Sequence, residues 1–206
     1  MFCKTCLVAT ALLAPLTMLA ASDDPKVATA QTAAAAQTWN IDDTHSMALF
    51  RVQHMGAGMF WGRFNDVSGT ISTSGAGPDS IAFDISIDVA SVSSGNDKLD
   101  GHLKSPDFFS VKEFPKMTFK STKATRGSDG MWDVTGDLTM HGVTKPVTAK
   151  VEMIGRSSMG AERVGFEASF SINRSEFGMS YGVEKGAIGN SVRVVVGLEA
   201  MPPSKK

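Results

Sequence analysis

Apolar and polar side chains alternate along most of the chain from about residue 38 onward. The clearest run covers 81–89, where Ile81, Phe83, Ile85, Ile87 and Val89 alternate with small or acidic residues. Successive side chains of a strand point to opposite faces of its sheet, so this run predicts a strand with one buried face. Five further segments share the pattern: 48–54, 132–140, 147–153, 164–172 and 192–198.

Shorter strands are predicted over 62–72 and 116–124, and Gly- and Asp-rich turns such as 75–78 and 127–130 separate the segments. About eight strands with one apolar face and short connections indicate an antiparallel all-β domain, either a sandwich or a barrel.

One segment, 95–111, lacks the alternation. Asn96 is a typical helix N-cap, and Ser105-Pro106-Asp107 is typical of a helix start with proline in the first turn. We therefore expect short helices inserted between two strands. In a barrel, such an insert can cover one open end.

The N-terminus predicts a secretory signal peptide over 1–22, with Lys4 before an apolar stretch from Leu7 to Ala21 and small residues at the end of it. Cleavage after 28–30 and an uncleaved membrane anchor are the alternatives. No apolar run reaches the roughly 20 residues of a stable membrane span. The remaining chain divides into a flexible leader (23–37), a barrel domain (38–200) and a C-terminal tail (201–206).

Both cysteines, Cys3 and Cys6, lie before the apolar stretch and should leave with the signal. Their C-x-x-C spacing occurs in redox and zinc motifs, but no second Cys or His pair completes a zinc set. The exported domain is then expected to fold without disulfides, on its core alone.

Charge and composition exclude some functions. The chain has 20 Lys and Arg, 21 Asp and Glu, and a net charge of −1, which argues against nucleic-acid binding. The chain is 42% hydrophobic, which rules out general disorder. The chain has 12 Met and 12 Phe but one Tyr. Methionine is flexible and adapts to irregular apolar contacts, and a lining of Phe with few polar groups suits an apolar ligand.

Catalytic and metal motifs are weak. The four histidines, His45, His54, His102 and His141, match no compact metal spacing. His54 shares the parity of Phe50 and Val52 and is predicted to face the interior, so it is the candidate for a haem or metal ligand. No G-x-S-x-G motif is present, and the local group of Asp100, His102 and Asp107 fits an ordinary charged helix turn. We expect no enzyme activity and no resident cofactor.

Four stretches together resemble a known family. They are DTHS (43–46) with FRVQHM (50–55), LDGHLKSPDFF (99–109) followed by Phe114-Pro115, GDLTMHGVTKPV (136–147), and INRSEFGM (172–179). Their order and spacing resemble the YceI-like family of exported polyisoprenoid-binding proteins, and the resemblance covers about 38–200. The family commonly has Arg before the Asp of its helical motif, where this chain has Leu99.

The resemblance implies an eight-stranded antiparallel, lipocalin-like barrel with a short helical insert near 95–111. It also implies a periplasmic carrier, not known for catalysis, whose lumen sequesters a polyisoprenoid or the tail of an isoprenoid quinone. A nine-residue strand at a tilt near 40° spans roughly 23 Å, which would hold four or five extended isoprene units.

Strand parity, rather than a motif, selects the lumen residues. The predicted ligand-binding set is Phe50, Val52, His54, Phe83, Ile85, Ile87, Leu138, Met140, Val151, Phe166, Phe170, Val194 and Val196. Two other functions stay open: a haem or metal carrier using His54, and an envelope interaction module with a fully packed barrel. A homodimer is possible.

Overall fold

The computed structural model describes residues 36–73 and 80–203. The predicted signal peptide (1–22), nearly all of the leader, the turn at 75–78 and the last three residues of the tail lie outside the described residues.

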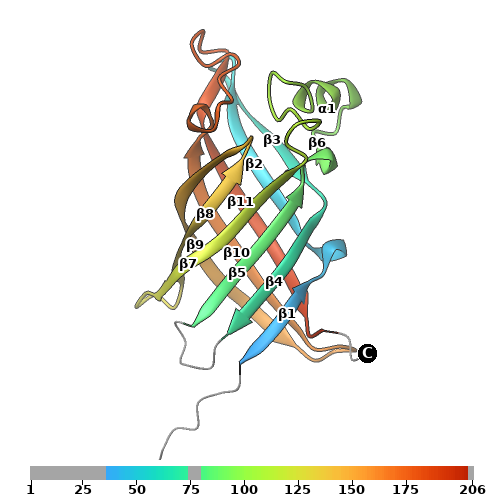
Figure 1. Ribbon diagram of the computed structural model, residues 1–206, viewed down its shortest axis with the longest axis vertical. Coiled ribbons are helices and arrows are strands. Elements are labelled where there is room, and N and C mark those ends of the chain that lie inside the picture. Colours follow the sequence, from blue (N-terminus) through green and yellow to red (C-terminus); the bar gives the residue numbers. More distant parts are fainter. Residues whose placement is uncertain (1–35, 74–79, 204–206) are drawn as a thin grey trace, which may run out of the picture. The chain divides into compact units, whose positions relative to one another are not determined.

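The described chain is mainly β-structure with one short α-helix (Figure 1). The strands are β1 (Gln37–Ile41), β2 (Met47–His54), β3 (Gly58–Phe64), β4 (Val67–Thr73), β5 (Ile81–Asp88), β6 (Val92–Ser93), β7 (Lys116–Arg126), β8 (Trp132–Met140), β9 (Val143–Ser157), β10 (Arg163–Asn173) and β11 (Ile188–Met201). The helices are α1 (Asp97–Leu103) and the 3-10 turns η1 (Asp43–His45), η2 (Val89–Ser91) and η3 (Arg174–Phe177).

The strands form one closed antiparallel sheet. Its order is β1-β4-β5-β7-β8-β9-β10-β11, and β11 closes the ring by pairing with β1 near its C-terminal end and with β2 along the rest of its length. β2, β3 and β6 continue the walls of β1, β4 and β5, so three of the eight walls are made of two strands each. The prediction of an eight-stranded antiparallel barrel is confirmed.

The prediction of a single strand over 62–72 is wrong in one respect. This stretch belongs to two strands, β3 and β4, which are separated by Asn65 and Asp66. The backbone N–H groups of Asn65 and Asp66 both donate to the Oγ of Ser91, each at 3.1 Å. These bonds hold the chain bent between β3 and β4. The buried positions shift from even numbers, as at Phe64, to odd numbers, as at Val67. A change of parity by one residue is the signature of such a break.

The insert between β6 and β7 contains one helix instead of several. Asn96 caps α1 as predicted, its Oδ1 accepting from the backbone N–H of Leu99 at 3.1 Å. The helix predicted at Ser105-Pro106-Asp107 is absent, and turns occupy that stretch. The N–H groups of Phe109 and Val111 donate back to the carbonyls of 103 and 104, so the chain folds over α1 instead of starting a new helix.

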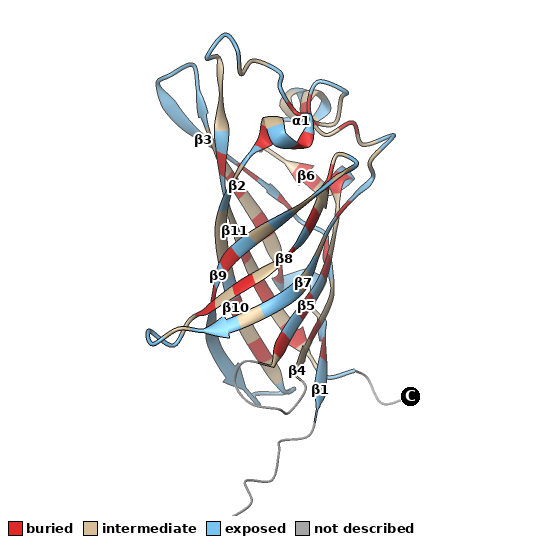
Figure 2. Ribbon diagram, turned by 60° about the vertical axis from the view of Figure 1, so that its left-hand side comes forward, coloured by how far each residue is buried: buried red, intermediate tan, exposed pale blue. Residues whose placement is uncertain are grey.

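Apolar side chains fill the end of the barrel that contains β1. Trp39, Ile71, Trp132, Val164 and Ala200 are all buried there, and none of them lines the internal cavity described below. Figure 2 shows the alternation of buried and exposed residues along the strands that surround this core. Within the described ranges, no helix has the length and hydropathy that crossing a membrane requires.

Candidate functional site: the barrel lumen

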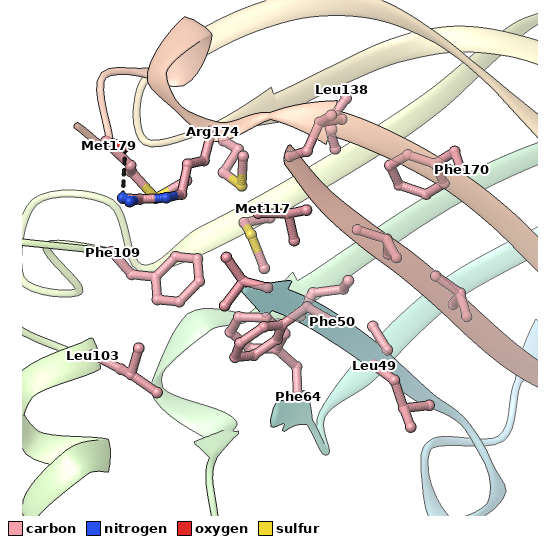
Figure 3. Close-up of a pocket in the computed structure, with 18 of the residues that line it drawn as sticks. Leu49, Phe50, Phe64, Leu103, Phe109, Met117, Leu138, Phe170, Arg174 and Met179 are labelled. Atoms are coloured by element: carbon pink, nitrogen blue, oxygen red, sulfur yellow. Dashed lines mark hydrogen bonds between the residues drawn. The ribbon is translucent and has the colours of Figure 1, made fainter. Parts of the chain in front are cut away.

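The part of the barrel interior that lies away from β1 is hollow. A cavity of about 730 Å³ lies inside it, and side chains from all eight of its walls line it. Figure 3 shows that side chains from several strands converge on this space, with Phe50, Met117, Leu138 and Phe170 among them. The lining is almost entirely aliphatic, aromatic or thioether, so it can accommodate an apolar ligand.

All thirteen residues that strand parity selected line this cavity. They are Phe50, Val52, His54, Phe83, Ile85, Ile87, Leu138, Met140, Val151, Phe166, Phe170, Val194 and Val196. Their position in the lumen is a matter of geometry, and their contact with a ligand stays a prediction.

The strand register brings these residues side by side. Phe170 on β10 pairs with Val194 on β11, and Val194 pairs in turn with Phe50 on β2. Residues directly opposite each other on one face are close enough for their side chains to pack. Each such row therefore forms a continuous apolar band round part of the lumen.

An aromatic cluster lies where the lumen approaches α1 (Figure 3). The ring centroid of Phe50 is 5.7 Å from that of Phe64 and 6.2 Å from that of Phe109, and Phe64 and Phe109 meet edge to face at 5.2 Å. Sequence reasoning missed Phe64, because the break at Asn65 hid its strand. It missed Phe109 because that residue belongs to the segment without alternation.

The insert and the loop before β11 surround the mouth of the lumen. The ring of His102 lies 4.9 Å from that of Phe108 and 5.3 Å from that of Tyr181, while its Nε2 is 2.9 Å from Oδ2 of Asp107. Leu99 also lines the cavity. The position at which the family commonly has Arg therefore contributes an apolar side chain to this mouth.

Asp100 bonds Ser94 and takes no part in the contact between His102 and Asp107. Its Oδ1 accepts hydrogen bonds from the backbone N–H of Ser94 at 2.6 Å and from the Ser94 hydroxyl at 2.5 Å. These bonds, chiefly the one from the hydroxyl, hold the pKa of the Asp100 carboxyl below its ordinary value. Asp100 thus ties α1 to Ser94, the residue that follows β6.

Arg174 is the unexpected polar group of the lining. Its side chain is only 4% exposed, and its guanidinium donates to the carbonyls of Gly189 (2.8 Å), Met179 (2.9 Å), Tyr181 (2.7 Å) and Ile188 (3.0 Å). Burial lowers the pKa of Arg174 from its ordinary value. The side chain thus holds the 178–189 loop, whose last two residues begin β11, against the barrel (Figure 3).

The predicted candidate for a metal or haem ligand, His54, is exposed at the end of β2. In the part of the chain that the structure describes, the one group of three potential metal ligands is Asp42, His45 and Glu199, and it does not include His54. Nη1 of Arg163 bonds both Asp42 Oδ2, at 3.0 Å, and Glu199 Oε1, so a guanidinium already compensates these acids.

Known proteins resemble this chain in sequence and in fold. The model of the YceI-like domain matches residues 39–200. A protein named YceI from Escherichia coli is 33% identical over 159 residues, covering 76% of this chain and 82% of that protein. BcnA from Burkholderia cenocepacia shares the fold, with a TM-score of 0.70 at 24% identity over 78% of this chain and 99% of that one.

A polyisoprenoid binding domain from Saccharophagus degradans, implicated in plant cell wall breakdown, also shares the fold. Its TM-score is 0.65 at 21% identity, over 81% of this chain and 99% of that one. The family match spans most of the described barrel, and the resemblance read from the four sequence stretches is confirmed. The chain belongs to the YceI-like family.

Proposed function

We propose that this protein is an exported carrier that sequesters an amphiphilic isoprenoid lipid, a polyisoprenoid or an isoprenoid quinone, in its barrel lumen. The observation that carries the proposal is the cavity of about 730 Å³ whose lining is almost wholly apolar. The name of the Saccharophagus degradans domain, which has the same fold, supports this class of ligand. The tail would lie among the inward-facing residues, with the head group at the mouth beside α1.

The depth of the lumen limits how much tail it buries. The lining covers 134–140 on β8, 166–172 on β10 and 192–198 on β11. Each stretch rises about 20 Å along its strand, or about 15 Å along the barrel axis at a tilt near 40°. This depth holds about three extended isoprene units of roughly 5 Å each. It is shorter than the four or five units expected from sequence, because Trp39 and Trp132 help to fill the far end of the barrel.

Three buried isoprene units contain fifteen carbons, and their burial is worth roughly 12 kcal/mol at about 0.8 kcal/mol per carbon. Association costs at least about 4 kcal/mol of this. The remainder, up to about 8 kcal/mol, corresponds to micromolar binding. Hydrophobic burial alone therefore suffices for a carrier, without a specific bond to the head group.

The two other functions fare differently. A fully packed interaction module is contradicted by the cavity itself. The haem or metal carrier gains no support from His54, which is exposed at the end of a strand and has no second and third ligand among the described residues. We assign no catalytic role to Asp100 or His102, since the former bonds Ser94 and the latter packs against aromatic rings at the mouth.

Export to the periplasm is part of this proposal and rests on the signal-like stretch 1–22. Cleavage between Ala20 and Gln37 would remove Cys3 and Cys6, the two cysteines of the chain. Protein recovered from the periplasm of a Gram-negative host should then show a shortened N-terminus and no reaction with a thiol reagent. An intact Met1 on exported protein would contradict the cleavage.

A titration with isoprenoid alcohols of increasing length tests the carrier function. Affinity should rise steeply up to about three isoprene units and then level off, because further units gain no burial in a lumen about 15 Å deep. A linear alkyl alcohol of matched carbon number is the control for tail chemistry. Absence of binding at every length, or an affinity that keeps rising with length, would contradict binding inside the barrel.

A further inference from the structure

The hairpin of β2 and β3 carries large apolar side chains in water. Met55 is 65% exposed, Met59 53% and Trp61 46%. Met55 has a φ of +52°, followed by Gly56 at +66°. A left-handed conformation costs a residue other than glycine about 1 kcal/mol, and such strain often marks a functional position. Hairpin turns favour Gly, Asn or Asp in this conformation, so a methionine is unusual at position 55.

Two arginines lie beside these side chains on the outer face of the barrel. Arg51 on β2 pairs with Arg193 on β11 on one side and with Trp61 on β3 on the other. The Arg51 guanidinium lies over the Trp61 ring, with Cζ 5.6 Å from its centroid. Like charges directly opposite each other on one sheet face repel. The pairing of Arg51 with Arg193 is therefore unfavourable unless an anion compensates it.

The described part of the chain places no anion against these two arginines. Residues 47–64 contain no Asp or Glu, and neither do residues 185–198. Among the residues that the structure describes, neither Arg51 nor Arg193 forms an ion pair. The positive charge of this face is thus uncompensated, although the whole chain carries a net charge of −1.

The same hairpin borders the mouth of the lumen. The backbone N–H of Met55 donates to the carbonyl of Ala187 at 2.7 Å, which joins the hairpin tip to the loop that carries Tyr181. Met55 and Met59 also line the cavity, so apolar surface is continuous from the lumen to the outside. Figure 2 shows the exposed tip of this hairpin at the end of the barrel that carries α1.

We propose that Arg51, Met55, Met59, Trp61 and Arg193 form a docking patch for a bilayer surface that contains anionic lipid. The arginines would face phosphate groups, Trp61 would lie at the depth of the head groups, and the methionines would enter the acyl boundary. Docking in this way sets the mouth of the lumen against the membrane, where an amphiphilic lipid can pass between the two without crossing water.

The experiment uses flotation of the purified exported protein with vesicles of phosphatidylcholine, with and without phosphatidylglycerol. Binding should require phosphatidylglycerol and weaken as salt is raised. Each arginine near an anionic surface contributes roughly fivefold to the affinity, so the variant R51S/R193S should bind about 30-fold more weakly. The matched control K120S/K123S removes two exposed lysines of β7, on a different wall, and should bind as the wild type does.

Tryptophan fluorescence gives an independent readout. The chain has three tryptophans, and Trp39 and Trp132 are buried, so a blue shift on vesicle binding should come from Trp61. Trp61→Phe should abolish the shift. M55S/M59S should weaken binding even at low salt, because the apolar contribution does not depend on charge.

Docking fails as an explanation if wild type ignores phosphatidylglycerol vesicles, or if K120S/K123S loses as much affinity as R51S/R193S. Self-association that R51S/R193S abolishes would assign the patch to a second copy of the chain and also overturn the proposal. The proposal rests on the carrier function for its purpose, but the two are tested separately. Isoprenoid binding without vesicles should be unchanged in R51S/R193S, and loss of isoprenoid binding in wild type would refute the carrier alone.

Discussion

Gly62 on β3 lies directly against the ring of Phe50 on β2, so close that a Cβ at position 62 would come within 2.3 Å of the Phe50 Cζ. The two residues are paired in register, and both face the interior. The missing side chain lets the ring lie back against the barrel wall. An aromatic ring over a strand glycine is a known device of curved sheets, and here it keeps part of the lumen free.

Gly62→Ala should push the Phe50 ring into the lumen. We expect a loss of about 1–3 kcal/mol in the free energy of unfolding and a weaker affinity for isoprenoids, because the ring then occupies ligand space. Urea unfolding and ligand titration measure the two effects. Gly155→Ala on β9 is the control, since a Cβ there meets nothing within 4 Å and Gly155 does not line the cavity. Equal ligand affinity in both variants would show that Phe50 does not limit the lumen.

Phe170→Trp and Ile85→Trp should overfill the lumen. Both side chains line the cavity, so the larger ring takes up space that a ligand needs. The variants should keep the circular dichroism of a β-barrel and lose the longest isoprenoids first. Glu167→Trp places the same side chain on the outward face of β10 and should bind as wild type does. Unchanged binding in folded Phe170→Trp would place the ligand elsewhere.

Arg174→Met should release the 178–189 loop. Four carbonyls lose a charged donor. Each buried carbonyl left without a hydrogen-bond partner lowers the stability by about 1–3 kcal/mol, unless a water molecule replaces the donor. Hydrogen exchange of the loop amides should accelerate, and the protein should unfold several kcal/mol more easily. Arg193→Met, the same change at an exposed arginine, should alter stability by less than about 0.5 kcal/mol. Slow exchange in both variants would deny Arg174 this role.

Asp42 should make the barrel sensitive to acid. Hydrogen bonds from the His45 ring, the Thr44 N–H and Arg163 lower its pKa, although burial opposes them. Because the folded pKa is the lower one, stability is complete above the ordinary carboxyl pKa of about 4 and is lost as the pH falls through the folded value. Asp42→Asn should cost about 2 kcal/mol at pH 7 and flatten the fall in stability below pH 4.

Urea unfolding at several pH values between 7 and 2.5 measures this slope. The neighbouring exposed Asp43→Asn is the matched control, which should reproduce the slope of wild type. An Asp42→Asn variant whose stability falls with acid as steeply as wild type would remove Asp42 from the explanation.

The sequence predicted the barrel and its lumen well. Each strand places alternate side chains on opposite faces of the sheet, so the buried face can be identified within one strand, whatever its neighbours are. Phe166, Phe170 and Val194 could be assigned to the interior from strand parity alone, without any knowledge of their partners. The bend at Asn65 was missed because it depends on Ser91, a residue of another wall. Turns that are fixed by contacts distant in sequence leave little trace in the pattern of apolar residues.

The mouth was the least predictable part. Phe109 and Tyr181 reach it from segments without regular structure, so no period marks them. Arg174 did leave a signal: it continues the even-numbered inward series of β10 after Ile172, where a charge is unexpected. Its use, however, depends on carbonyls of a loop that folds back onto it, which the sequence does not reveal.

Native mass spectrometry of the protein purified from its own cell envelope shows whether a lipid occupies the lumen. We expect a non-covalent adduct that organic solvent releases as an isoprenoid lipid, present in wild type and Glu167→Trp and lost or shortened in Phe170→Trp. Wild-type protein without any adduct, or an adduct that Phe170→Trp retains unchanged, would contradict a lipid carried in the lumen.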